Sequence, residues 1–146
     1  HPMPAGSWDD AAVSETVELR VRVADTDLMG VVYNSNFLVW FEIGRTELIR
    51  SRGISYAEVE RRGYSLPVIE ARFSVRRPAR YDDLLTIETR LCELRSRKVV
   101  FRYQIRRDGE LLVEGETSHV PTRHGDETRA VVIPEWLRDR LSGPAT

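Results

Sequence analysis

The feature that most constrains the fold is an unbroken apolar run, Phe37 to Phe41, inside a segment with helical periodicity. Apolar side chains occupy both faces of the predicted helix: Phe37, Trp40, Phe41, Gly44 and Leu48 on one, and Leu38, Val39 and Ile43 on the other. A helix that is apolar nearly all round must be buried. The sequence therefore predicts one long central helix that other elements cover on several sides.

Segments on both sides of this helix alternate apolar and polar residues with a period of two, which is the pattern of half-buried strands. The first runs from Val17 to Val23, and the others cover 69–76, 85–91 and 99–105. A hairpin turn at Asp108-Gly109 then leads into a last strand at 111–122. In the strand at 69–76, the predicted buried residues are Ile69, Ala71, Phe73 and Val75.

One buried helix and about five strands have few stable arrangements, because the helix needs apolar cover and each strand offers one apolar face. We therefore expect an α+β fold in which an antiparallel sheet wraps around the helix. Other α+β folds, with a sheet backed by one helix, fit the same periodicity. Two short helices are also predicted, one from Ser55 to about Arg62 with a capping box and one at 133–141.

The length of 146 residues and the hydrophobic content of 41% fit one domain with one core. Residues 1–15 are rich in Pro, Ala, Gly, Ser and Asp without periodicity, so we predict a flexible arm there and a single domain over 16–146. No apolar run approaches the length of a membrane helix, and no signal-like segment is found, so a cytoplasmic address is expected.

Charge and cysteine content argue against several classes of protein. The chain has 22 basic and 23 acidic residues, which is not the balance of a general nucleic-acid-binding surface. Its single cysteine, Cys92, excludes an intramolecular disulfide and a multi-cysteine zinc site. Neither His119 nor His124 has a partner at metal-ligand spacing. We therefore expect no metal and no cofactor.

The acidic turn before the helix carries the main candidate for chemistry. Asp27 follows the first strand and lies in the short loop before the helix start, where an isolated carboxylate is well placed to act on a bound molecule. An aspartate at such a position also commonly closes a turn or caps a helix. The residue pattern alone leaves both roles open.

Residues 25–37 read DTDLMGVVYNSNF, and residues 40–53 read WFEIGRTELIRSRG. These strings resemble the hotdog-fold acyl-CoA thioesterases of the 4-hydroxybenzoyl-CoA thioesterase type, whose motif is close to D-T-D-x-x-G-V-V-Y-H-x-x-Y before a helix with W/F-F-E-x-x-R-T-E. The resemblance spans Val17 to Leu141 and implies a hotdog fold. It places the family's catalytic aspartate on Asp27 and its variable neighbour, often His or Tyr, on Asn34. Asn34 can replace the hydrogen bonding of such a His but not its titration.

A thioesterase needs a base or nucleophile near the thioester carbonyl carbon and N–H donors near the carbonyl oxygen. Asp27 can activate water or attack directly to give an anhydride. Free backbone N–H groups around Asn34 to Asn36, helped by the helix dipole, can hold the oxyanion. Asn34, Ser35 and Asn36 are also ordinary capping residues.

The other candidate substrate-binding residues lie in the same turn and in a distant basic turn: Gly30, Val31, Tyr33, Ser35 and Asn36, with Arg95, Arg97 and Lys98. The basic turn, like a second cluster at 76–80, can bind coenzyme A phosphates or an acidic carrier protein. The alternative is that these charges are only solvated, as is common in turns. The turn alone can explain Gly30, and the Tyr33 side chain can fill the core instead of contacting the substrate. Glu42 and Arg45 have the i, i+3 spacing of a structural ion pair.

The resemblance implies hydrolysis of an acyl-CoA or acyl-carrier-protein thioester. One alternative is a hotdog module that binds acyl-CoA as a ligand or sensor without turnover. Another, hydration or dehydration of an acyl thioester, would pair a His with an acid, and the motif contains no His. The resemblance also implies homodimers with a continuous sheet and shared sites, often paired into homotetramers. A monomer with a charged outer sheet face is the alternative, and no nucleic-acid or membrane partner is expected.

Overall fold

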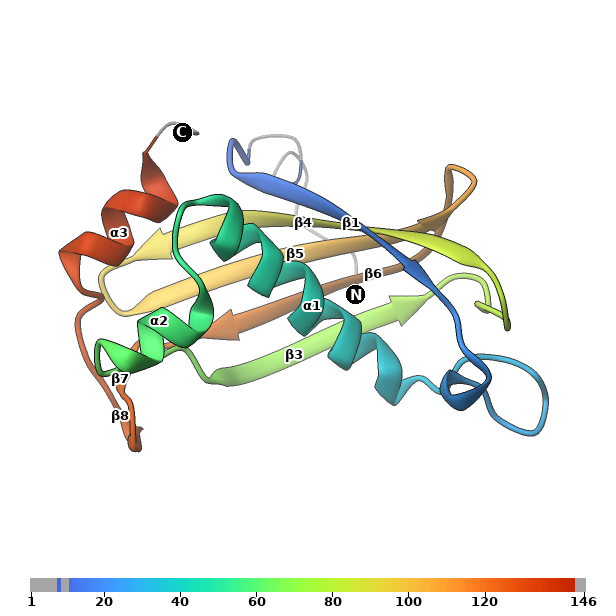
Figure 1. The fold of residues 1–146 in the computed structure, drawn as a ribbon, viewed down its shortest axis with the longest axis horizontal. Coiled ribbons are helices and arrows are strands. Elements are labelled where there is room, and N and C mark those ends of the chain that lie inside the picture. The colour runs from blue at the N-terminus through green and yellow to red at the C-terminus, as the bar shows by residue number, and fades with distance from the viewer. Residues whose placement is uncertain (1–7, 9–10, 144–146) are drawn as a thin grey trace.

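The structure is a computed structural model that describes Trp8 and residues 11–143 (Figure 1). Its elements in chain order are β1 (Ser14–Arg20), the 3-10 helix η1 (Val23–Asp25), α1 (Ser35–Ser51), α2 (Tyr56–Arg61), β2 (Tyr64–Ser65), β3 (Val68–Val75), β4 (Leu84–Arg95), β5 (Lys98–Arg107), β6 (Glu110–His119), β7 (Thr122–Arg123), β8 (Asp126–Ala130) and α3 (Glu135–Ser142).

Five long strands form an antiparallel sheet in the order β1-β4-β5-β6-β3, and β2, β7 and β8 form a small second sheet. In Figure 1, α1 lies across one face of the large sheet, which curves around it. The predicted α+β fold, with a sheet of five strands around one long helix, is confirmed.

Two glycines let α1 lie close against the sheet. A Cβ atom on Gly44 would lie 2.2 Å from Thr89 Oγ1, and one on Gly115 would lie 2.4 Å from Phe41 Cζ. With that space free, the Phe41 ring stacks on the Tyr103 ring at a centroid distance of 4.3 Å. Phe41 and Tyr103 are both fully buried, so this contact lies at the centre of the core.

The prediction that α1 is buried all round is wrong. Its first face is buried, but Leu38 is 41% and Val39 is 51% exposed on the other. A single curved sheet has one concave face, and that face covers only one side of the helix. Nothing in the described part of the chain covers Leu38 and Val39.

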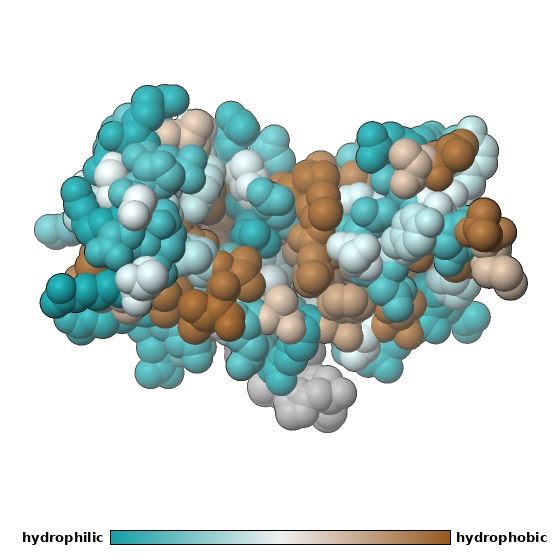
Figure 2. All heavy atoms as spheres, turned by 90° about the horizontal axis from the view of Figure 1, so that it is seen from below, coloured by the Kyte–Doolittle hydropathy of each residue, from teal (hydrophilic) through white to brown (hydrophobic). Residues whose placement is uncertain are grey.

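The strand at β3 is confirmed, but the prediction of a buried face along it is wrong. Ile69 is 58% and Val75 is 42% exposed, and Phe73 is the member of the alternating set that packs against the core. The cause is position, because β3 is an edge strand. A register shift between Val68 and Glu70 also interrupts its pairing with β6. Figure 2 looks onto the molecule from this side and shows hydrophobic atoms gathered between two more hydrophilic flanks.

The predicted short helices are confirmed as α2 and α3. Ser55 caps α2 by accepting a hydrogen bond from the Glu58 N–H at 3.1 Å, as the capping-box spacing predicts. Pro134 occupies the N-cap position of α3. The first strand ends at Arg20, earlier than predicted, because η1 takes up the residues that follow.

The N-terminal arm predicted over 1–15 lies largely outside the described residues, which omit 1–7 and 9–10. Ser14 and Glu15 already belong to β1. The Trp8 carbonyl accepts a hydrogen bond from Arg90 Nη1 at 2.5 Å, and its ring lies under the same guanidinium. In the described residues, no helix is both long and apolar enough to cross a membrane.

Candidate functional site

A tight loop joins η1 to α1 and carries the candidate carboxylate. The Asp27 N–H donates to the Val31 carbonyl at 2.8 Å, and the Gly30 N–H donates to the Asp27 carbonyl at 3.0 Å. Gly30 has a φ of +79°, a conformation that favours glycine. The turn therefore needs Gly30 for its backbone conformation.

The carboxylate of Asp27 is held by one oxygen only. Its Oδ1 accepts hydrogen bonds from the Met29 N–H at 2.8 Å and from the Val31 N–H at 3.3 Å. In the described part of the chain, Oδ2 has no hydrogen-bond or ion-pair partner, and the residue is half-exposed. Asp27 thus closes the turn through Oδ1 and keeps Oδ2 available for chemistry.

Asp25, two residues earlier, has a structural role. It is 3% exposed and accepts hydrogen bonds from Arg22 N at 2.8 Å and Arg22 Nη2 at 2.9 Å. The hydrogen bond from the Arg22 side chain lowers the pKa of the Asp25 carboxyl below its usual value. The sequence interpretation missed this pair, although the i, i+3 spacing of Arg22 and Asp25 indicates it.

The main chain of Asp25 also fixes the start of α1. The Asp25 carbonyl accepts hydrogen bonds from the Tyr33 N–H at 3.0 Å and from Asn36 Nδ2 at 2.9 Å. Asn36 is therefore a structural link between the loop and the helix. Tyr33 is 48% exposed, so its side chain does not fill the core.

The start of α1 leaves two backbone donors free. The Asn36 N–H donates to the Tyr33 carbonyl at 3.0 Å, whereas the N–H groups of Asn34 and Ser35 have no acceptor in the described residues. The Asn34 side chain makes no capping hydrogen bond. Of the three predicted oxyanion donors, the structure thus leaves Asn34 and Ser35 available at the positive end of the helix dipole.

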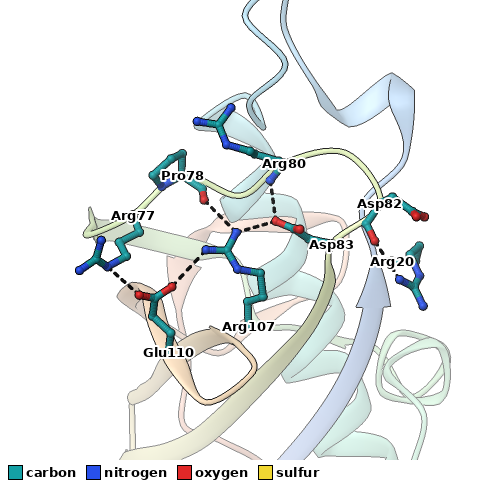
Figure 3. A network of polar contacts seen from close by, with 8 residues as sticks. All are labelled: Arg20, Arg77, Pro78, Arg80, Asp82, Asp83, Arg107 and Glu110. Carbon is teal, nitrogen blue, oxygen red and sulfur yellow. Dashed lines mark hydrogen bonds and ion pairs between the residues drawn. The ribbon is translucent and has the colours of Figure 1, made fainter.

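The loop docks onto the connection between β3 and β4. The Val32 N–H donates to the Ala79 carbonyl at 2.8 Å, and Val31 forms an antiparallel bridge with Arg80. A polar network stabilises this connection (Figure 3): Arg107 pairs with Asp83 at 2.7 Å and with Glu110 at 3.1 Å.

Two arginines of the basic cluster at 76–80 form ion pairs with carboxylates of β6. Arg76 pairs with Glu114 at 2.6 Å, and Arg77 pairs with Glu110 at 2.8 Å. The Arg80 guanidinium has no such carboxylate partner in the described residues, and Figure 3 shows it directed away from the network. Arg80 is therefore the arginine of this cluster without a carboxylate partner in the described residues, and its bridge with Val31 places it at the border of the Asp27 loop.

The predicted basic turn at 95–98 lies at the far end of the sheet from Asp27 (Figure 1). β4 runs from Leu84, close to the Asp27 loop, to Arg95, which is roughly 35 Å at about 3.3 Å per residue. Arg95 forms an ion pair with Glu93, while Arg97 and Lys98 are exposed. The structure does not bring this turn to the Asp27 of the same chain.

The predicted ion pair between Glu42 and Arg45 is not formed. Glu42 is exposed and Arg45 is half-buried, and neither has an ion-pair partner within 4.0 Å among the described residues. The i, i+3 spacing permits a pair, but Arg45 lies close to the Tyr103 hydroxyl instead. Within the described ranges, no three His, Cys, Asp or Glu side chains are grouped to hold a metal ion.

Comparison with known proteins gives a consistent result. The model of the thioesterase-like superfamily matches residues 21–141. The acyl-CoA thioester hydrolase YbgC of Escherichia coli O6:H1 is 32% identical over 99 residues, which cover 67% of this chain and 74% of that protein. The 4-hydroxybenzoyl-CoA thioesterase of Pseudomonas sp. (strain CBS-3) is 28% identical over 132 residues, 84% of this chain and 94% of that protein.

Solved structures agree with these relatives. A hypothetical protein from Thermus thermophilus has a TM-score of 0.83 and 40% identity, over 87% of this chain and 96% of that one. A 4-hydroxybenzoyl-CoA thioesterase, solved as an Asp-to-Asn variant with 4-hydroxybenzoyl-CoA, has a TM-score of 0.81 and 26% identity, over 90% of this chain and 100% of that one. The predicted hotdog fold and thioesterase resemblance are confirmed. Because the family model covers well over half of the sequence, the chain belongs to the thioesterase-like superfamily and is a thioester hydrolase.

Proposed function

We propose that this protein hydrolyses acyl-CoA thioesters, with Asp27 as the base or nucleophile and the N–H groups of Asn34 and Ser35 as oxyanion donors. The observation that carries the proposal is that Asp27 Oδ2, in the loop that leads into α1, and the N–H groups of Asn34 and Ser35 at the start of α1 all lack a partner in the described residues. The relatives' activities on CoA thioesters support the choice of substrate.

In the base mechanism, the thioester carbonyl oxygen accepts hydrogen bonds from the two amides, and Asp27 Oδ2 takes a proton from a water molecule. The water oxygen bonds to the carbonyl carbon, and negative charge develops on the carbonyl oxygen, where the amides and the helix dipole stabilise it. The carbon–sulfur bond then breaks, and the thiolate takes up the proton. The products are the free acid and coenzyme A.

In the nucleophilic mechanism, Asp27 Oδ2 bonds to the same carbon and displaces the thiolate to give a mixed anhydride. Water then hydrolyses the anhydride and regenerates the carboxylate. Both mechanisms need the same two features, a free carboxylate oxygen and donors at the carbonyl oxygen. The free Oδ2 also favours an enzyme over a module that only binds acyl-CoA.

We further propose that two copies pair through β3. The exposed apolar side chains Val68, Ile69 and Val75 lie on this edge strand. An edge strand with apolar side chains favours pairing with a second strand. Pairing would bring the basic turn of one copy toward the site of the other, where Arg95, Arg97 and Lys98 can contact coenzyme A phosphates.

A panel of acyl-CoAs, with release of free thiol as the readout, tests the proposed activity. Hydrolysis of at least one acyl-CoA that is lost in Asp27→Asn supports it, and binding without thiol release by the wild-type protein contradicts it. The same assay with acyl-carrier-protein thioesters decides between the two thiol carriers. A cytoplasmic address remains a prediction.

A further inference from the structure

A cavity of about 190 Å³ lies beside the C-terminal half of α1, away from the Asp27 loop. Most of its lining is apolar, with a few polar groups, which is the usual character of a small-molecule site. Apolar walls come from the segment between β2 and β3, which includes Leu66, Pro67 and Val68, and from Ile49 and Phe101. The charged lining residues are Glu42 and Arg45 of α1.

Arg45 carries a charge that the described part of the chain does not neutralise. Its side chain is half-buried, and no carboxylate of the described residues lies within 4.0 Å. Arg50, on the same helix, is exposed and pairs with Glu47 at 2.8 Å. A partly desolvated cation without a partner is unfavourable unless something else supplies the negative charge.

His119, which also lines the cavity, adds no positive charge to that of Arg45. It is fully buried. Its Nδ1 lies 2.9 Å from the Leu66 carbonyl oxygen, and because a carbonyl can only accept, Nδ1 is the donor. Burial lowers its pKa to about 4, so the ring is neutral at pH 7 and Nε2 accepts a hydrogen bond from Thr117 Oγ1 at 2.8 Å. That hydroxyl in turn accepts from the Tyr103 hydroxyl at 2.5 Å. The cavity's positive charge therefore comes from Arg45.

One face of α1 connects the cavity to the proposed reaction centre. Helical spacing places Ser35, Leu38, Glu42 and Arg45 on this face, because successive members are three or four residues apart. Leu38 and its neighbour Val39 are the exposed apolar residues along it. Arg45 follows Ser35 by ten positions, which is about 15 Å at 1.5 Å per residue.

We infer that this cavity takes the far end of the acyl group and that Arg45 selects acyl thioesters carrying a second, distal carboxylate. The inference rests on the proposed function, since the thioester lies at the start of α1. The apolar middle of the acyl chain covers Leu38 and Val39, and a chain on the order of ten carbons spans the distance. Glu42, which also lines the cavity, is exposed, so water and salt screen its repulsion, whereas the charge of the half-buried Arg45 is screened less.

The test compares kcat/KM for the decanedioic acid monothioester of CoA with that for decanoyl-CoA. The wild-type protein should prefer the charged substrate by about tenfold or more, as expected for a charge-assisted pair. In Arg45→Gln this ratio should fall to near one, and Arg45→Lys should keep part of it. Arg50→Gln is the matched control and should keep the wild-type ratio. A wild-type ratio near one, or an unchanged ratio in Arg45→Gln, overturns the inference.

A change in the substrate repeats the test without altering the protein. The methyl ester of the decanedioic monothioester removes the distal charge and should be hydrolysed like decanoyl-CoA. Equal kcat/KM for the ester and the free carboxylate overturns the inference, as does equal kcat/KM for 10-hydroxydecanoyl-CoA and the free carboxylate.

Calorimetry with the free acids separates this inference from the proposed function. Decanedioate should bind the wild-type protein more tightly than decanoate, and Arg45→Gln should lose the difference. If that holds while no thioester is hydrolysed, the proposed function fails and the cavity assignment stands. If both thioesters are hydrolysed equally and the two acids bind alike, the cavity assignment fails and the proposed function stands.

Discussion

Asp25 and Asp27 lie two residues apart in one loop, but their carboxylates have opposite surroundings. Asp25 is buried and fully engaged by Arg22, at 2.9 Å from Nη2, whereas Asp27 accepts hydrogen bonds through Oδ1 alone and is half-exposed. The first acid stabilises the loop, and the second retains an oxygen for a bound molecule. Substitutions at the two positions should therefore have different effects.

Asp27→Asn should lower kcat by about a hundredfold or more, because the amide can neither take a proton nor act as a nucleophile. The fold should be retained, since the Asn carbonyl oxygen can still accept from the Met29 and Val31 N–H groups. Steady-state kinetics and circular dichroism on the same preparation check both points. Near-normal kcat in a folded Asp27→Asn protein would falsify the assignment.

Asp25→Asn is the matched control for that variant. It removes a charged acceptor from Arg22 and should cost about 1–2 kcal/mol of unfolding free energy. Its main effect should be a lower Tm, with kcat reduced less than in Asp27→Asn.

Asn34→Ala should cost less than about tenfold in kcat, because the proposed donor is the backbone N–H and the side chain makes no capping hydrogen bond. Measuring kcat of both proteins with one acyl-CoA checks this prediction. A loss as large as that of Asp27→Asn would show that the side chain itself takes part in the reaction.

Arg80→Gln should raise KM for an acyl-CoA by about three- to tenfold if its unpaired guanidinium contacts a phosphate. The corresponding acyl-pantetheine lacks phosphates, so its KM should not change. Arg76→Gln is the control, because Arg76 is occupied by Glu114 at 2.6 Å. Equal KM changes for the two thioesters would show that Arg80 does not act on a phosphate.

The unfolding free energy should decrease as the pH falls from about 6.5 to 4 because of His119. Its pKa is about 4 in the folded protein and 6.5 in the unfolded chain, so the unfolded state binds the extra proton in this window. The slope approaches about 1.4 kcal/mol per pH unit between these values. Denaturant unfolding at several pH values measures it.

His119→Gln should flatten this slope, while the exposed His124→Gln should leave it in place. The same slope in His119→Gln and the wild-type protein would assign the pH dependence to other groups.

Self-association is the last prediction. Sedimentation at micromolar concentration should give a mass that is a multiple of 16.8 kDa, and Ile69→Asp on the β3 edge should reduce it toward one chain. Val132→Asp, at a residue that is 50% exposed outside the sheets, is the control. A wild-type mass near 16.8 kDa would contradict pairing through β3.

The sequence was sufficient for the long helix, the five long strands and the two short helices, but it did not predict η1 or the small sheet of β2, β7 and β8. The helix at 35–51, the long strands and the Ser55 cap follow from periodicity and local spacing, which the printed residues contain directly. Periodicity could not show that Leu38, Val39 and Ile69 face outward. An apolar face has the same sequence pattern whether the chain's own sheet or another chain covers it.

The site was predicted in outline only. Spacing placed Asp27 before a helix start, but only the three-dimensional turn shows which of its oxygens is free. The separation of the basic turn from Asp27 depends on the length of β4. Whether Arg45 has a carboxylate partner among the described residues depends on which side chains of other elements lie around it. These relationships join residues that are distant in the chain, so local patterns do not contain them.

The hydrogen bonds from Tyr33 and Asn36 to the Asp25 carbonyl lie entirely within the protein and join the loop to the start of α1. The turn and the helix start are therefore preorganised, and binding should require little ordering of the backbone around the reacting carbonyl. Acceleration by such a site depends on dipoles that are already aligned before the transition state forms. The catalytic step should then depend little on solvent viscosity, because the loop that carries Asp27 is already fixed to the start of α1.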